Sequence, residues 1–219
     1  KELVERLELS EMTLKKTLLF PSYLPSIASF AAMVQHKVIW EVSGNYQKQS
    51  LRNRAYITND RGIHSLTIPV QGKGELSHRR SYDQIPIDNS QPWQRTHWRT
   101  LQTAYRTSPF FEYYEQDLEP LFTHSHDYLL AYNLEVIKII CGCLQIPFSE
   151  NHTTVFEKES QSTNDHRHLI SPKASKDLNF PEYQQVFGDR HGFIPNLSIL
   201  DLLFNEGPNA LAILNNTLV

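Results

Sequence analysis

Residues 16–42 contain the pattern that most restricts the fold of this chain. Residues 16–20 (KTLLF) and 37–42 (KVIWEV) are short apolar runs with the length of buried strands. Residues 27–35 lie between them and place their apolar side chains on one face of a helix. A strand, a helix and a strand in succession predict a βαβ-like unit with parallel strands and a ligand crevice at the strand ends.

The first turn of this unit holds a candidate ligand contact. Pro21 and Pro25 bracket the turn, and Ser26 can cap the helix that follows. Tyr23 lies between the two prolines, at the junction where the crevice is expected. We therefore expect Tyr23 to orient a substrate.

The chain then continues as a strand meander. Residues 51–57 (LRNRAYI) alternate between two faces, as a strand does. A turn signal at residues 59–62 separates them from a second strand at 64–70, and residues 82–87 form a further strand or an extended arm. Together with the βαβ-like unit, this pattern predicts a mixed sheet.

A basic patch is expected on the first strand of the meander. Arg52 and Arg54 would project from one face of it, with Lys48 just upstream. Neighbouring guanidinium groups suit bidentate binding of a phosphate or a carboxylate, although a solvated outer face has the same composition. Asn53 would lie on the opposite, otherwise apolar face, where it could orient an acceptor.

Residues 93–108 predict an amphipathic helix, which Pro109 ends. At about 100° per residue, the arginines and threonines take one side and the aromatic residues the other. His97 lies on the aromatic side, between Trp93 and Trp98. Two interpretations of His97 remain open, namely a hydrogen-bonded core histidine and a general base.

Helical patterns dominate the second half of the chain. We expect an α/β fold, a mixed sheet with an N-terminal βαβ-like unit and a strand meander, followed by a helical C-terminal half. The expected parts are an N-terminal extension (1–16), an α/β core (17–148), a polar loop or linker (149–176) and a helical segment packed on the same domain (177–219). Because Met12 could be the natural start, residues 1–11 need not belong to the natural protein.

Composition excludes several classes of protein. A net charge of -3 gives no overall field that would attract nucleic acid or an anionic membrane. No apolar run approaches the roughly 18 residues that span a bilayer, so we expect no membrane insertion. Cys141 and Cys143 point in different directions on a helix and predict neither a disulfide nor a shared metal. Free thiols without an export signal favour the cytoplasm.

Motifs for common cofactors and metals are absent or incomplete. The chain has no GxxxxGK[ST] loop, no GxGxxG, no DxD pair and no GxSxG elbow, so we expect no cofactor. The clusters 124–127 (HSHD) and 165–168 (DHRH) lack a third ligand at a fixed spacing, and we expect no metal. Asp201 and Asn205, four residues apart on an apolar helix, either face a cleft together or form its wet side.

Several segments together form a specific set. They are Pro21 to Pro25 (PSYLP), Lys48 with Arg52 to Arg54, the LTIPV strand with its GKG loop, Trp93 with His97, Ala104-Tyr105 with Pro109, and LSILDLLFNEG at 197–207. From about Thr17 to the C-terminus, the chain resembles the WbqC-like family of bacterial proteins. The family often has glutamine where this chain has Phe20, so a ligand role of that position does not carry over.

The resemblance implies a role in bacterial surface-polysaccharide (O-antigen type) biosynthesis, and a glycine transferase activity has been suggested for such proteins. It brings no catalytic residue set. From their chemistry, we expect His97 to act as general base, and Lys48, Arg52 and Arg54 to hold a phosphate or carboxylate.

The expected protein is therefore a transferase that modifies a sugar precursor, with a small sugar or amino-acid derivative as its partner. Nucleic acid is not expected to bind, and homo-oligomerisation remains open. The alternative is a non-catalytic ligand-binding or assembly protein of a polysaccharide-modifying complex. His97 would then be a structural residue, and the basic and aromatic side chains would form a ligand or partner surface.

Overall fold

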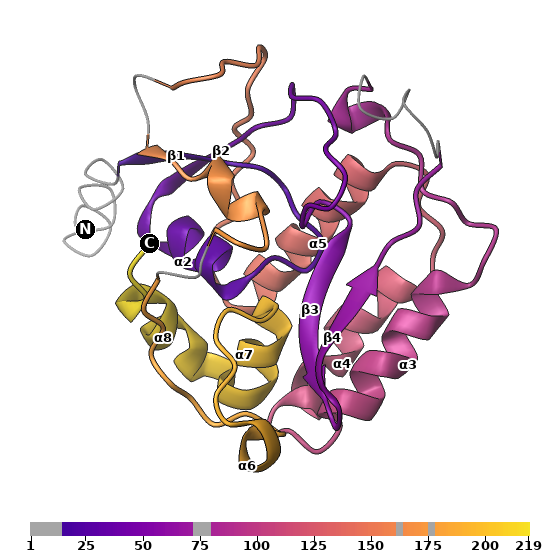
Figure 1. The fold of residues 1–219 in the computed structure, drawn as a ribbon, viewed down its shortest axis with the longest axis vertical. Helices are drawn as coiled ribbons and strands as arrows, with labels where there is room; N and C mark the ends of the chain where they lie inside the picture. Colours follow the sequence, from indigo (N-terminus) through magenta and orange to yellow (C-terminus); the bar gives the residue numbers. More distant parts are fainter. Residues whose placement is uncertain (1–14, 72–79, 161–163, 175–177) are drawn as a thin grey trace, which may run out of the picture.

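The computed structural model describes residues 15–71, 80–160, 164–174 and 178–219. Most of the expected N-terminal extension and the GKG loop lie outside these ranges. Figure 1 shows the small parallel sheet at one end of the molecule and helices packed below it. The fold is mixed α/β, with a three-stranded parallel sheet, a separate hairpin and a mostly helical C-terminal half.

The predicted βαβ unit is confirmed. Strands β1 (Lys16–Leu19) and β2 (Lys37–Trp40) pair in parallel, and helix α2 (Ile27–Gln35) connects them. The Oγ of Ser26 accepts a hydrogen bond from the N–H of Ser29 at 3.3 Å, so Ser26 caps α2 as expected.

The third strand of the sheet was not predicted. Strand β5 (Asn164–Asp165) pairs in parallel with β1 and gives the order β2-β1-β5. It belongs to the stretch expected to be a polar loop or linker, and two residues are too few to show any periodicity. The segment before β5 runs over the end of the sheet (Figure 1), where His152 bridges Trp40.

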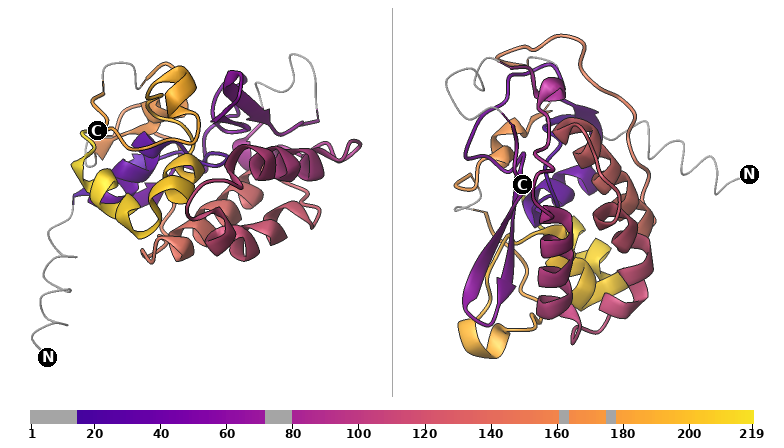
Figure 2. Two further views of the ribbon diagram at one scale, coloured as in Figure 1. Left: turned by 90° about the horizontal axis from the view of Figure 1, so that it is seen from below. Right: turned by 90° about the vertical axis from the view of Figure 1, so that its right-hand side faces the viewer.

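The meander is a two-stranded antiparallel hairpin of β3 (Arg54–Asn59) and β4 (Gly62–Thr67), outside the parallel sheet. Figure 2 shows it beside helix α3. Strand β3 begins later than the alternation predicted, because the backbone of Leu51 and Arg52 binds other segments. The expected arm at residues 82–87 is a 3-10 turn, η2 (Tyr82–Gln84), followed by a bridge from Ile87 to Val70.

Helices account for most of the remaining chain, and Pro109 separates the first two of them as expected. They are α3 (Trp93–Tyr105), α4 (Phe111–Leu118), α5 (Leu129–Cys143), α6 (Gly188–His191), α7 (Ile199–Glu206) and α8 (Ala210–Asn216), with 3-10 turns η3 (Glu119–Phe122), η4 (Arg167–Ile170) and η5 (Gly207–Asn209). Within the described part of the chain, none of the helices has the length and apolar character needed to cross a lipid bilayer.

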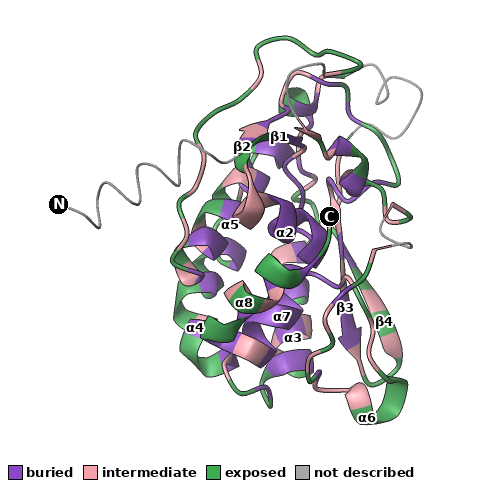
Figure 3. Ribbon diagram, turned by 90° about the vertical axis from the view of Figure 1, so that its left-hand side faces the viewer, coloured by how far each residue is buried: buried purple, intermediate pink, exposed green. Residues whose placement is uncertain are grey.

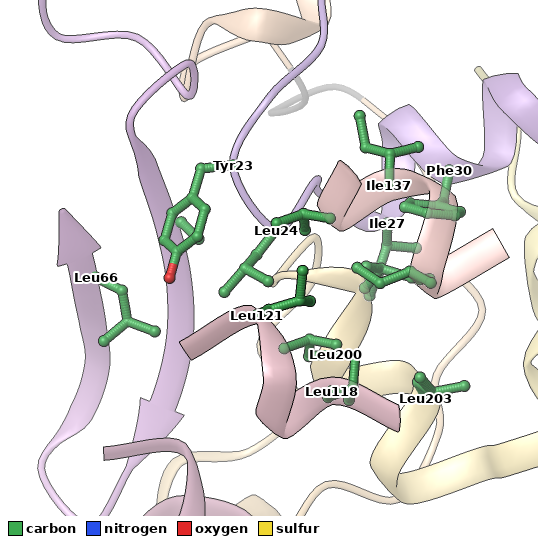
Figure 4. Packing of buried hydrophobic residues seen from close by; sticks show 14 of the residues in the cluster. Tyr23, Leu24, Ile27, Phe30, Leu66, Leu118, Leu121, Ile137, Leu200 and Leu203 are labelled. Atoms are coloured by element: carbon green, nitrogen blue, oxygen red, sulfur yellow. The ribbon is translucent and has the colours of Figure 1, made fainter. Parts of the chain in front are cut away.

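One apolar core connects these elements. Figure 3 shows α2 and α7 almost wholly buried, whereas α4 and α8 expose their outer sides. In Figure 4, Tyr23 and Leu24 lie between Leu66 of the hairpin and the apolar side chains of the helices. The turn that leads into α2 therefore forms part of the core that joins the hairpin to the helices.

The side chain of Asp201 in α7 connects this helix by hydrogen bonds to α3 and to residues 183–185. This side chain is 0% exposed and accepts hydrogen bonds from the hydroxyls of Tyr105 at 2.8 Å and Tyr183 at 2.5 Å, and from the amide of Gln185 at 3.0 Å. Burial raises the pKa of Asp201, and the three donors oppose this shift. Asn205 is also buried and donates to the Asp201 carbonyl, so the pair does not form a wet side. Asn205 lines a pocket of about 420 Å³ and Asp201 does not, so the two do not face a cleft together.

We expect Asp201→Ala to lower the free energy of unfolding by at least about 3 kcal/mol, because two tyrosine hydroxyls and one amide would lose their buried acceptor. Urea unfolding measures this change. Asp189→Ala is the control, since Asp189 is exposed in α6. An equal loss of unfolding free energy in the two variants would contradict the role of Asp201 in connecting these segments.

Candidate functional site

Tyr23 and His97 form a buried pair. The hydroxyl of Tyr23 lies 2.8 Å from Nδ1 of His97, and the rings of Trp93 and Tyr132 pack against the pair. Burial raises the pKa of Tyr23, so this hydroxyl keeps its proton and donates a hydrogen bond to the imidazole. The pattern of α3 therefore placed His97 on the correct face, but gave no sign of its partner in the turn before α2.

Burial also sets the charge of His97, which is 6% exposed. Desolvation lowers its pKa to about 4, although a hydrogen bond with the backbone of Thr67 favours the charged form. The ring is thus neutral near pH 7 and hydrogen-bonds both the Tyr23 side chain and the β4 backbone.

A small pocket lies beside Tyr23, and we call it the Tyr23 pocket. It has a volume of about 230 Å³ and is lined by Tyr23, Arg54 and Tyr56, among others, and by residues 195–198. The buried Nε of Arg54 has no hydrogen-bond partner among the described residues. Tyr23 and Arg54 are therefore brought together at one pocket, whereas His97 is not among its lining residues and is connected to it only by the hydrogen bond with Tyr23.

Two residues that line this pocket have left-handed backbone conformations. They are Leu24, with φ of 39°, and Asn196, with φ of 54°. Asparagine tolerates this conformation, and here its Oδ1 also accepts the N–H of Ala28 at 2.8 Å. For leucine it is a strained conformation, and such strain is concentrated at functional sites.

The start of α2 borders the same pocket but does not supply free donors. The N–H of Ile27 donates to the carbonyl of Leu197 at 3.0 Å, and those of Ala28 and Ser29 also have partners. An anion in the Tyr23 pocket would therefore be held mainly by the Arg54 side chain rather than by the helix end.

Arg52 lines a different and larger space, which we call the Arg52 cavity. Its volume is about 830 Å³, and its walls include Phe20, the 43–47 loop, Phe156 and Lys158. The guanidinium of Arg52 lies 4.0 Å from the centre of the Phe20 ring. Asn133 fixes the backbone here, because its amide donates to the Arg52 carbonyl at 2.6 Å.

A hydrogen-bonded backbone layer lies between the two spaces. The carbonyl of Leu51 accepts the N–H of Tyr23 at 3.0 Å, and the N–H of Leu51 donates to the carbonyl of Ile170 at 2.9 Å. Arg52 and Arg54 therefore do not project side by side from one strand face, contrary to the expectation. Residues 51–53 form a turn, so strand alternation does not apply to them.

The other two expected binding residues line neither space. Asn53 closes the base of the hairpin, since its amide donates to the Ile68 carbonyl at 2.9 Å and its own carbonyl accepts the N–H of Ile68 at 2.8 Å. Lys48 lies in the exposed turn before Arg52. Among the described residues, no three His, Cys, Asp or Glu side chains are arranged to hold a metal ion.

Several residues of these sites could not be predicted from the sequence. A leucine in a sequence does not indicate a left-handed backbone conformation, so that of Leu24 could not be predicted. Phe156, Lys158 and Arg167 reach the Arg52 cavity only because β5 joins the sheet, and their segment shows little periodicity.

Comparison with known proteins gives one family and one relative. The chain is 27% identical to the uncharacterized protein Rv1507c of Mycobacterium tuberculosis in an alignment 220 positions long, which covers 86% of this chain and 92% of the relative. No solved structure matches the chain. The sequence profile of the WbqC-like protein family matches residues 21–178 and 173–213. These ranges include every segment that forms the Tyr23 pocket, and the chain belongs to the WbqC-like protein family.

Proposed function

We propose that this protein is a transferase of bacterial surface-polysaccharide biosynthesis, which attaches a small acyl group such as glycyl to a sugar precursor in the Tyr23 pocket. The observation that carries the proposal is the hydrogen-bonded Tyr23–His97 pair beside a small pocket lined by Arg54. The family supplies the biological setting, as the resemblance implies, and the pocket supplies the chemistry.

The size of the Tyr23 pocket supports a small transferred group. A volume of about 230 Å³ is below the roughly 300–1,000 Å³ of pockets that enclose drug-sized ligands. A glycyl group fits such a space, whereas a complete sugar nucleotide does not. The guanidinium of Arg54 matches a carboxylate or phosphate on the bound molecule.

The Tyr23–His97 pair provides a path for a proton. An acceptor hydroxyl or amine would attack the acyl carbon of the donor, forming a new bond while the bond to the leaving group breaks. Its proton would pass to the oxygen of Tyr23 as the Tyr23 proton passes to His97 Nδ1, and would later protonate the leaving group. His97 is neutral near pH 7 and can accept this proton, although a pKa of about 4 makes it a weak base.

We expect His97→Asn to lower kcat for acyl transfer at least about tenfold with little change in KM, because proton acceptance acts in the transition state. Transfer to an amino-sugar acceptor, followed by mass spectrometry, measures the rates. His126→Asn is a matched control, since burial also lowers the pKa of His126, whereas the Tyr23 hydroxyl hydrogen-bonds His97. A loss below tenfold would contradict the base role.

We expect Arg54→Gln to weaken binding of a small carboxylate such as glycine at least about tenfold, because charge-assisted hydrogen bonds contribute about 1.5–3 kcal/mol. Calorimetric titration measures the dissociation constants. Arg61→Gln, in the exposed turn of the same hairpin, is the control and should bind like the wild type. Unchanged affinity in Arg54→Gln would exclude the Arg54 guanidinium as the anion contact.

One observation favours the alternative, a ligand-binding or assembly protein without turnover. His97 hydrogen-bonds both Tyr23 and the backbone of Thr67, as a structural core histidine does. In that case, small ligands would still raise the melting temperature, and the rise would depend on Arg54. No product would form, and His97→Asn would change stability alone.

Stability should depend on pH through His97 in both cases. Because its pKa falls from 6.5 to about 4 on folding, the unfolded chain binds the proton more tightly, and stability is lost as the pH drops from 6.5 towards 4. Between pH 7.5 and 5, His97 should account for a loss of about 2 kcal/mol. Urea unfolding of the wild type and His97→Asn at both values isolates this loss, which should be missing from the variant. Parallel losses would show that His97 does not titrate as its burial requires.

A further inference from the structure

Arg52 is a buried cation that forms no ion pair within the described part of the chain. Its side chain is 1% exposed, and it is the largest of the fully buried side chains. Nη1 donates to the Oγ of Ser50 at 3.2 Å, while Nε has no partner. Within residues 15–71, 80–160, 164–174 and 178–219, no carboxylate forms an ion pair with it. A buried charge is normally paired, so the chemistry of this side chain suits an anionic ligand.

Arg167, the second arginine that lines the Arg52 cavity, shows how a buried arginine is usually neutralised. Arg167 donates to Asp165 at 2.6 Å, to Glu41 at 3.3 Å and to the carbonyls of Glu157 and Lys158. Two carboxylates neutralise it, and its donors are used. The positive charge available to a ligand therefore comes from Arg52 and from Lys158, which lines the same cavity.

The rim of the cavity also presents a flat apolar surface. Phe156 is 46% exposed, although it stands in a polar segment, and Arg167 lies over its ring at 5.2 Å. Gly44 allows this position, because a Cβ at residue 44 would lie 3.1 Å from the Phe156 ring and 3.2 Å from that of Phe20. A side chain at residue 44 would require the Phe156 and Phe20 rings to shift by a few tenths of an ångström.

We propose that the Arg52 cavity binds a nucleotide, with its phosphates at Arg52 and Lys158 and its base against Phe156. Guanidinium groups match phosphate oxygens, and aromatic side chains stack on bases of any sequence. The volume of about 830 Å³ lies in the range for ligands of this size, and one inorganic phosphate would fill little of it. The site shares no residue with the proposed acyl-transfer machinery and does not depend on it.

Calorimetric titration of the full chain with UDP, ADP, inorganic pyrophosphate and uridine tests this site. We expect both nucleoside diphosphates to bind at least about tenfold more tightly than pyrophosphate or uridine, since only they combine the charge with the ring. Arg52→Met should weaken the binding of UDP at least about 30-fold, and Phe156→Ala about tenfold. Arg106→Met, at an exposed arginine on the C-cap of α3, should bind UDP like the wild type.

Melting temperatures separate a binding role from a structural one. Because no described carboxylate forms an ion pair with Arg52, Arg52→Met should melt without ligand at the wild-type temperature or above it. A lower melting temperature together with undiminished UDP binding would overturn the proposal. So would the absence of nucleotide binding in the wild type, or pyrophosphate binding as tight as UDP binding and unaffected by Phe156→Ala. None of these outcomes bears on small-carboxylate binding at Arg54, so the two sites can fail separately.

Discussion

Two hydrogen bonds of the Leu51 backbone position both cavities. Its carbonyl holds the N–H of Tyr23, and its N–H holds the carbonyl of Ile170, so the turn before α2 and the segment after β5 meet at one residue. Because both polar backbone groups of Leu51 are used in this way, it cannot pair in the hairpin, and β3 begins only at Arg54. The division into a Tyr23 pocket and an Arg52 cavity follows from this arrangement.

The buried charges of the protein show which groups serve the fold. Asp201 accepts hydrogen bonds from three donors, and Arg167 is paired with two carboxylates. In both cases these partners compensate for the cost of removing the charge from water. Both groups join distant segments, and both lack capacity for a ligand. Arg52 is buried as completely as these two residues, but its Nε has no hydrogen-bond partner among the described residues. Incomplete satisfaction of a buried group costs stability, and natural sites for ligands carry such a cost.

The sequence predicts those features that depend on local pattern. The βαβ unit and the buried face of α3 were predicted correctly, because each is encoded by neighbours along the chain. Strand β5 was missed because two polar residues pair with β1 only through the tertiary fold. The relation of Arg52 to Arg54 was missed because alternation holds only inside a strand. Tyr23 and His97 are 74 residues apart, and no spacing rule connects them.

The strain at Leu24 has a cause in the elements on both sides of it. Tyr23 is fixed by its N–H on Leu51 and by its hydroxyl on His97, while Ser26 must begin α2 as the N-cap. Leu24 and Pro25 alone connect these two fixed points, and proline cannot take a positive φ. The reversal therefore falls on Leu24, whose side chain is 1% exposed and is held by the core. Because the core holds the strained residue and Leu51 holds the tyrosine, the Tyr23 pocket has its shape before any ligand arrives.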